Sequence, residues 1–202
     1  MQRIGILGGS FDPVHNGHLL LAQEILSELD LNRIIMMPTR IQPFKQDQKT
    51  ASVEDRLAML ELATSDNDIF EISTIELDRD EVSYTINSLR ILSEQYKDET
   101  ELLFIIGYDM FLNITKWWEA EQLLKDYSIV VGMRPGVDDE EINSFADKLR
   151  KEYGATIYCV NNREFDVSST EIKERIKEGR SLKYLVPDSV IEYIYEKELY
   201  RD

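Results

Sequence analysis

The segment GGSFDPVHNGH, residues 8–18, contains the amino acids best suited to chemistry. It holds both histidines of the chain, His15 and His18, together with three glycines. Glycine lets the backbone come close to a bound group, because no Cβ intervenes. A helix that starts here would add free N–H groups and the positive end of its dipole. Since an imidazole donates one hydrogen bond when neutral and two when protonated, the segment predicts a site for anionic oxygens, such as those of a phosphate.

Known nucleotide and metal motifs fit this segment less well. It has neither the GxxxxGK[ST] pattern of a Walker loop nor the GxGxxG pattern of a dinucleotide fingerprint. A zinc site would need further ligands, and no Cys or Glu stands at a supporting spacing beside His15 and His18. A structural turn whose histidines cap a helix is the remaining alternative.

Short apolar strands alternate with amphipathic helices along the chain. The predicted strands cover residues 3–9, 33–38, 69–73, 101–107, 127–133 and 155–160. The predicted helices cover residues 19–29, 52–63, 83–96, 140–153 and 169–177, and a last helix starts after Pro187 with Asp188 as its cap. Because the strands are apolar almost throughout, we expect an α/β fold with a doubly wound parallel sheet and a small helical C-terminal part. A length of 202 residues suits a single domain, residues 1–202.

Ligands of such sheets bind beyond the carboxyl ends of the strands, where the winding changes direction. We therefore expect residues 8–18, 38–45 and 107–118 and the turn before Ser169 to meet at one site.

The composition describes a globular protein with a strong negative charge. Hydrophobic residues make up 43% of the chain, and 39 acidic against 23 basic residues give a formal net charge of −16. A chain this acidic is a poor candidate for non-specific binding to nucleic acid or to anionic membranes. The single Cys159 cannot form an internal disulfide, and no apolar run approaches the roughly 20 residues of a membrane span. With no export segment before the first predicted strand, we expect a cytoplasmic protein.

Residues 8–18 resemble the HxGH signature of the nucleotidyltransferase superfamily, and the whole chain is similar to the bacterial nicotinate mononucleotide adenylyltransferases. Further motifs of that family follow in the same order. They are PTRIQPFK (38–45), RLAML from Arg56, SYT (83–85), IGYDM (106–110), KW (116–117), RPG (134–136) and VSSTEIK (167–173). Each short piece is weak alone, but the first and the last in order, with the others between them, form a specific pattern.

The resemblance implies a Rossmann-like nucleotidyltransferase fold and transfer of the adenylyl group of ATP to nicotinate mononucleotide, with release of pyrophosphate, in NAD biosynthesis. It implies catalytic roles for His15, His18 and Lys45. The ATP-binding residues that it implies are Gly8, Gly9, Ser10, Gly107, Asp109, Arg134, Ser168, Ser169, Thr170 and Lys173. The residues that it implies for the mononucleotide are Phe11, Asp12, Tyr84, Thr85 and Trp117. No carboxylate cluster for a metal is evident, so Mg²⁺ is expected to bind with ATP and to keep some of its waters.

Some of these residues can also have a structural role. Ser168 stands at capping-box spacing from Glu171, and Asp109 can be a helix N-cap. Asp12 can orient the loop instead of touching the substrate. Trp117 has the context of an exposed turn and Trp118 that of a core residue, although the sequence does not rank the two.

Four positions depart from the usual family pattern. Phe44 stands where many members have histidine, Tyr108 where a small residue is usual, and Asn87 where aspartate is common. Lys173 replaces an arginine, which keeps the charge but loses the planar two-point grip on phosphate. This replacement predicts weaker ATP binding and not a lost activity.

Several alternative functions stay open. The acceptor can be nicotinamide mononucleotide, or phosphopantetheine, although the phosphopantetheine enzymes are usually shorter and should lack the SYT and KW elements. A cytidylyltransferase would normally carry a second motif different from VSSTEIK. A nucleotide-binding sensor without turnover is the alternative outside the enzymes. The sequence also leaves the oligomeric state open.

Overall fold

A computed structural model describes residues 1–41, 50–96, 99–133, 139–161 and 167–201. Within these ranges, six parallel strands form one sheet in the order β3-β2-β1-β4-β5-β6. The strands are β1 (Gln2–Gly9), β2 (Arg33–Pro38), β3 (Phe70–Ile72), β4 (Thr100–Gly107), β5 (Ser128–Met133) and β6 (Ile157–Asn161). The chain winds outward from β1 to β3, returns to β4 on the other side of β1, and continues to β6. The predicted doubly wound α/β fold is therefore confirmed, and its winding changes direction between β1 and β4.

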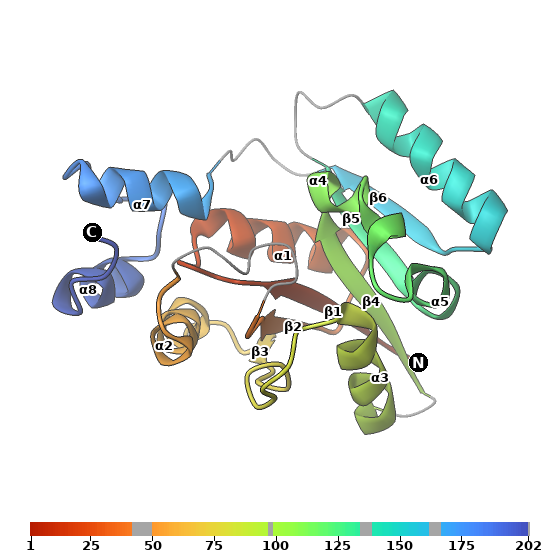
Figure 1. The fold of residues 1–202 in the computed structure, drawn as a ribbon, viewed down its shortest axis with the longest axis horizontal. Helices are drawn as coiled ribbons and strands as arrows, with labels where there is room; N and C mark the ends of the chain where they lie inside the picture. The colour runs from red at the N-terminus through yellow and green to blue at the C-terminus, as the bar shows by residue number, and fades with distance from the viewer. Residues whose placement is uncertain (42–49, 97–98, 134–138, 162–166, 202) are drawn as a thin grey trace.

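Helices cover both faces of this sheet (Figure 1). The helices that pack into the core of one face are α1 (Asn16–Glu28), α2 (Val53–Thr64), α7 (Ser169–Lys177) and α8 (Asp188–Glu196). Those of the other face are α3 (Thr85–Tyr96), α5 (Ala120–Asp126) and α6 (Asp139–Tyr153). The short helix α4 (Tyr108–Phe111) and the 3₁₀ helix η1 (Ile114–Lys116) lead from β4 to α5.

Two hydrophobic cores form because successive side chains of a strand point to opposite faces. In β1, Ile4 and Ile6 are buried on the α3 side, whereas Leu7 is buried on the α1 side. Gly5 lies between the two neighbouring strands, where a Cβ would come within 2.5 Å of Ile34 and 2.9 Å of Ile105. A side chain at this position would therefore require the buried side chains of Ile34 and Ile105 to shift.

The C-terminal helices are fixed to the rest of the fold by side-chain contacts. The hydroxyl of Tyr193 in α8 donates to Asp55 Oδ1 of α2 at 2.9 Å. Gly179 follows the end of α7, and its φ of +67° suits a glycine there. The predicted cap of α8 is wrong: Pro187 is the N-cap, and Asp188 pairs with Lys183. Among the described residues, no helix is long and apolar enough to cross a membrane.

Candidate active site

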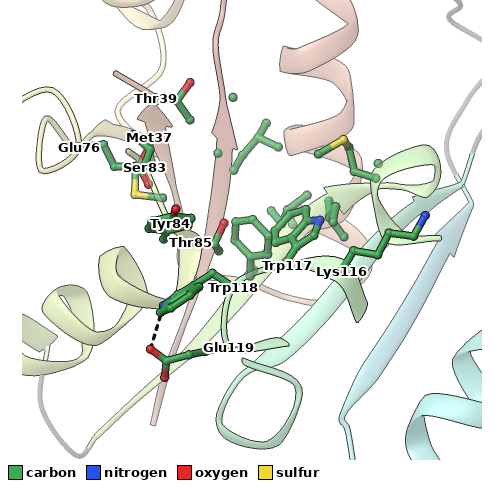
Figure 2. Close-up of a pocket in the computed structure, with 18 residues that line it drawn as sticks. Met37, Thr39, Glu76, Ser83, Tyr84, Thr85, Lys116, Trp117, Trp118 and Glu119 are labelled. Carbon is green, nitrogen blue, oxygen red and sulfur yellow. Dashed lines mark hydrogen bonds between the residues drawn. The ribbon is translucent and has the colours of Figure 1, made fainter. Parts of the chain in front are cut away.

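A pocket of about 430 Å³ opens where β1 and β4 end side by side. Its lining comes from the carboxyl ends of β1, β2 and β4, from the start of α3, and from the segment around η1 (Figure 2). The lining residues are Leu7, Gly8, Gly9, Met37, Thr39, Glu76, Ser83, Tyr84, Thr85, Phe104, Ile105, Ile106, Gly107, Met110, Lys116, Trp117, Trp118 and Glu119. The pocket lies where the change in winding predicts a ligand site.

The two histidines stand together at the start of α1. Their rings stack with 3.8 Å between centroids and 25° between planes. His15 is the N-cap of α1 and only 5% exposed, and its main-chain N–H donates to Nδ1 of His18 at 3.3 Å. Because Nδ1 of His18 accepts this bond, a neutral His18 carries its proton on Nε2, where it can be donated. The rings of Phe11 and His18 form a T-shaped pair, with 5.0 Å between centroids and 69° between planes.

Gly17, between the histidines, is required by packing, which the sequence reasoning did not identify. A Cβ at this position would lie 2.9 Å from Val167 Cγ1 and 3.0 Å from His15 Nδ1. Glycine therefore lets the first turn of α1 lie against the His15 ring and against Val167, which precedes the N-cap of α7.

Asp12 belongs to the loop that joins β1 to α1, and its carboxylate is held by protein groups. Oδ1 accepts hydrogen bonds from the main-chain N–H of Ala51 (3.0 Å) and from the hydroxyl of Tyr200 (2.7 Å). Oδ2 pairs with the ammonium of Lys173. Asp12 is 3% exposed, and neither Asp12 nor Lys173 lines the pocket, so the structure places both in a charged cluster outside the pocket lining.

Arg56 joins the ends of β1 and β2. Its Nη1 donates to the carbonyl oxygen of Ser10 at 2.7 Å and to that of Thr39 at 2.8 Å. The residue is 3% exposed, and burial lowers the pKa of its guanidinium, while the charge of Asp12 acts in the opposite direction. The sequence marks Arg56 only through the resemblance. Its place on the inner face of α2, one turn before the buried Leu60, is a signal that could have identified it.

The start of α7 lies against the β1–α1 loop. Ser168 is the N-cap and accepts from the main-chain N–H of Glu171 at 3.1 Å, so its capping role is confirmed. The capping box stays half-formed, because the carboxylate of Glu171 pairs with Arg175. The hydroxyl of Ser169 donates to the carbonyl oxygen of Pro13 at 3.0 Å, whereas Thr170 is exposed.

Aromatic residues form another wall of the pocket. The rings of Tyr84 and Trp118 lie side by side with 5.6 Å between centroids, and Trp118 Nε1 donates to Glu119 at 3.1 Å (Figure 2). Trp117 packs edge-on against Phe104 of β4 at 6.0 Å. The predicted contexts of the two tryptophans are wrong, because Trp118 is 59% exposed while Trp117 packs against the core. Neighbouring side chains of an extended backbone point in opposite directions, and both rings still line the pocket.

Glu76 is a buried carboxyl group that lines the pocket and that the sequence reasoning missed. It is 2% exposed, and the hydroxyl of Ser88 in α3 donates to its Oε1 at 2.6 Å. Burial raises the pKa of Glu76, and hydrogen bonds from Ser88 and Ser83 and the charge of Arg79 oppose this effect. No pattern in the sequence distinguishes Glu76 from the other acidic residues of the chain.

Other predicted site residues lie in several places. Gly107 lines the pocket and is the N-cap of α4, so the alternative that Asp109 is an N-cap is wrong. Asp109 is exposed, and its Oδ1 would lie 2.9 Å from a Cβ on Gly107. Lys45, Phe44 and Arg134 lie outside the described residues.

Comparison with known proteins gives one consistent result. Residues 6–175 match the model of the family described as cytidylyltransferase-like. Two relatives named "probable nicotinate-nucleotide adenylyltransferase" come from Thermoanaerobacter sp. (strain X514) and Hydrogenobaculum sp. (strain Y04AAS1). Their sequences are 42% and 43% identical to this one. Each alignment covers 98% of this chain, and the two alignments cover 94% and 97% of the respective relative. A third, from Halalkalibacterium halodurans, is 42% identical over 100% of this chain and 92% of its own length.

The fold is also shared with a solved structure. Plasmodium falciparum nicotinic acid mononucleotide adenylyltransferase, complexed with NaAD, superposes with a TM-score of 0.79 at 21% identity, over 99% of this chain and 98% of that one. Sequence identity along the full length, together with the family model, shows that this chain belongs to the cytidylyltransferase-like family and, within it, to the nicotinate-nucleotide adenylyltransferases.

Proposed function

We propose that this chain transfers the adenylyl group of ATP to nicotinate mononucleotide, forming nicotinate adenine dinucleotide and pyrophosphate. An oxygen of the acceptor phosphate attacks the α-phosphorus of ATP, and the bond from that phosphorus to the bridging oxygen of the β-phosphate breaks. The attacking oxygen is already anionic, so no protein base is required. Catalysis then depends on positioning the two substrates and on stabilising the charge of the transferring and leaving phosphates.

The observation that carries this proposal is the stacked pair of His15 and His18 at the start of α1, next to the end of β1. The hydrogen bond that His18 Nδ1 accepts leaves Nε2 as the donor for an oxygen of the α-phosphate. The positive end of the α1 dipole favours the same anion. Lys45, Ser168, Ser169 and Thr170 belong to the proposed phosphate site through the family resemblance.

The space next to Gly8 and Gly9 supports the proposal of a ligand in the pocket, because no atom of the described residues crowds these two positions. A Cβ on Gly8 would approach Phe104 no closer than 3.5 Å, and one on Gly9 would approach Phe11 no closer than 3.4 Å. Neither glycine has the positive φ that disfavours side chains. Protein packing and backbone conformation therefore tolerate the Cβ of an alanine at either position. The space over these glycines suits the close approach of a bound nucleotide.

The aromatic wall suits the acceptor. An indole ring offers a face on which a pyridine ring can stack, and both Trp117 and Trp118 are available. Tyr84 and Thr85 at the start of α3 complete this part of the pocket, and a main-chain N–H there can bind the nicotinate carboxylate. Gly107, Asp109 and Arg134 are proposed for the ribose and adenine parts of the nucleotides on the family resemblance.

Nucleotidyl transfer from ATP generally involves a divalent metal ion. Among the described residues, no group of three or more His, Cys, Asp or Glu side chains could hold one. Asp12, the carboxylate of the histidine loop itself, is occupied by Lys173 and Tyr200. We therefore propose that Mg²⁺ arrives with ATP on its phosphate oxygens and keeps several waters. We also propose that residues 1–202 act as a single domain in the cytoplasm.

The test is pyrophosphate release with ATP and Mg²⁺, measured in parallel with nicotinate mononucleotide, nicotinamide mononucleotide and phosphopantetheine. Release with nicotinate mononucleotide, at a rate well above the other two, is the expected result. Release with another acceptor only would replace the proposed substrate, and ATP binding without release would favour the sensor.

The His18→Ala variant tests the role of the histidine pair. Because the proposed donor acts in the transition state, turnover should fall by roughly 10²–10³ while the Kd for ATP changes less than tenfold. An equal loss in turnover and in ATP binding would remove His18 from that role.

A further inference from the structure

Tyr200, which follows α8, reaches the loop of the histidine pair from the far end of the sequence. Its hydroxyl donates to Asp12 Oδ1 at 2.7 Å across 188 positions of the chain. Its φ of 62° lies in the left-handed region. This conformation is energetically unfavourable for any residue that carries a Cβ. Surrounding contacts therefore hold the Tyr200 backbone in this conformation.

The contact belongs to a charged cluster and not to an isolated hydrogen bond. The ammonium of Lys173 pairs with the other carboxylate oxygen of Asp12 and lies 5.1 Å from the centre of the Tyr200 ring. The guanidinium of Arg56 is also close to Asp12: burial lowers the pKa of Arg56, and the charge of Asp12 opposes this effect. Burial, and after it the charge of Asp12, raise the pKa of Tyr200, so its hydroxyl stays protonated and acts as the donor.

Asp12 stands three residues before His15 in the same buried loop. The neighbouring Pro13 accepts from Ser169 of α7, and Val14 is fully buried. Because the backbone between Asp12 and His15 is short and held in place, a shift in the position of the Asp12 carboxylate should also shift the imidazole pair. If the proposed adenylyl-transfer function is correct, a small displacement here affects the phosphate that reacts.

We propose that Tyr200 is a positioning residue for this reaction. Its hydroxyl fixes the Asp12 carboxylate, and through Asp12 it sets the orientation of the loop that presents His15 and His18. Residues after α8 are thereby part of the catalytic apparatus, although they do not line the pocket.

A purely structural role predicts something different. Tyr193, in α8, makes a closely similar contact: its hydroxyl donates at 2.9 Å to Oδ1 of Asp55, an aspartate of α2 and not of the histidine loop. Tyr193→Phe and Tyr200→Phe each remove one hydroxyl donor from an aspartate while they keep the ring. Tyr193→Phe is therefore the matched control for a loss of anchoring alone.

The experiment compares the full-length protein with both variants by two measurements. Because His15 and His18 are the only histidines, a ¹H–¹⁵N imidazole spectrum of tag-free protein reports on these two rings alone. Tyr200→Phe should shift their signals and lower kcat for pyrophosphate release about tenfold, with KM for nicotinate mononucleotide within about twofold. Tyr193→Phe should leave the signals and kcat unchanged, and the two variants should have similar melting temperatures.

Unchanged imidazole signals in Tyr200→Phe would overturn the proposal, as would equal effects of the two variants on these signals. If the parent protein releases no pyrophosphate with any acceptor, the proposed function fails. In that case the imidazole spectrum still decides whether Tyr200 positions the histidines.

Discussion

Replacing Arg56 by methionine tests whether one buried guanidinium holds the ends of β1 and β2 together. Arg56 Nη1 donates to the carbonyl oxygens of Ser10 and Thr39 at 2.7 and 2.8 Å, and the residue is 3% exposed. Methionine keeps an unbranched, flexible side chain but has no donor. Both carbonyl groups would then lose this partner.

The size of the effect follows from these contacts. A hydrogen bond from a charged donor contributes about 1.5–3 kcal/mol. The loss of two is partly offset, because a buried cation no longer has to be desolvated, and burial does lower the pKa of Arg56. We expect the free energy of unfolding to fall by about 2–4 kcal/mol. For a chain of this length, that corresponds to a melting temperature lower by about 5–15 °C.

The assay is urea unfolding followed by tryptophan fluorescence, in which an unchanged m-value permits the comparison of stabilities. Arg33→Met is the matched control, since Arg33 pairs with Glu71 at 3.0 Å while both side chains are 37% and 45% exposed. Such a surface pair contributes at most about 1 kcal/mol. If Arg56→Met lost no more stability than Arg33→Met, the reasoning about the buried contacts would be refuted.

Three further predictions concern the pocket and its surroundings. Gly8→Ala should change the melting temperature by no more than about 2 °C, because the nearest atom to the added Cβ is 3.5 Å away. It should lower kcat/KM for ATP at least about tenfold, because the Cβ would occupy space proposed for the nucleotide. An unchanged kcat/KM would contradict a nucleotide over Gly8. Burial raises the pKa of Glu76, so the folded protein retains a proton that the unfolded chain releases, and stability is lost as pH rises above the ordinary carboxyl pKa. Urea unfolding should therefore show Glu76→Gln gaining stability relative to the parent between about pH 4 and about pH 7, and a constant difference would count against the raised pKa. Lys173→Arg should leave the Kd for ATP, measured by calorimetric titration, unchanged or lower. Arginine can pair with Asp12 as lysine does and has further N–H donors for a phosphate oxygen. A large rise in Kd would show that the cluster accepts only lysine.

Local patterns predicted much of the fold. Ser168 caps α7, as its spacing from Glu171 indicates. The apolar strands and amphipathic helices occur in the predicted order, because burial on one or two faces leaves a periodic record in each segment. The predicted cap of α8 failed because the helix already begins at Asp188 and Pro187 is its N-cap, and the exact end of a helix is set within one or two residues that a capping pattern does not resolve.

The positions of side chains in the site were less predictable. Trp117 and Trp118 are neighbours with the same chemistry, and only the direction of the backbone after η1 determines which one packs against Phe104. Glu76 is one of many acidic residues, and its burial depends on how α3 packs against the pocket. A one-dimensional pattern does not contain this information.

The sequence by itself determined the chemistry of the loop from Gly8 to His18 and the order of the elements around it. Both depend on residues close together in the chain, through helix starts, glycines and hydrophobic periodicity. Only the tertiary structure decided that Asp12 binds Lys173, 161 positions away, and Tyr200, 188 positions away. A buried carboxylate must find donors wherever the packed elements bring them, because leaving it unpaired in the interior is costly. The partners of Asp12 therefore became evident only once α7 and the residues after α8 were placed against the loop.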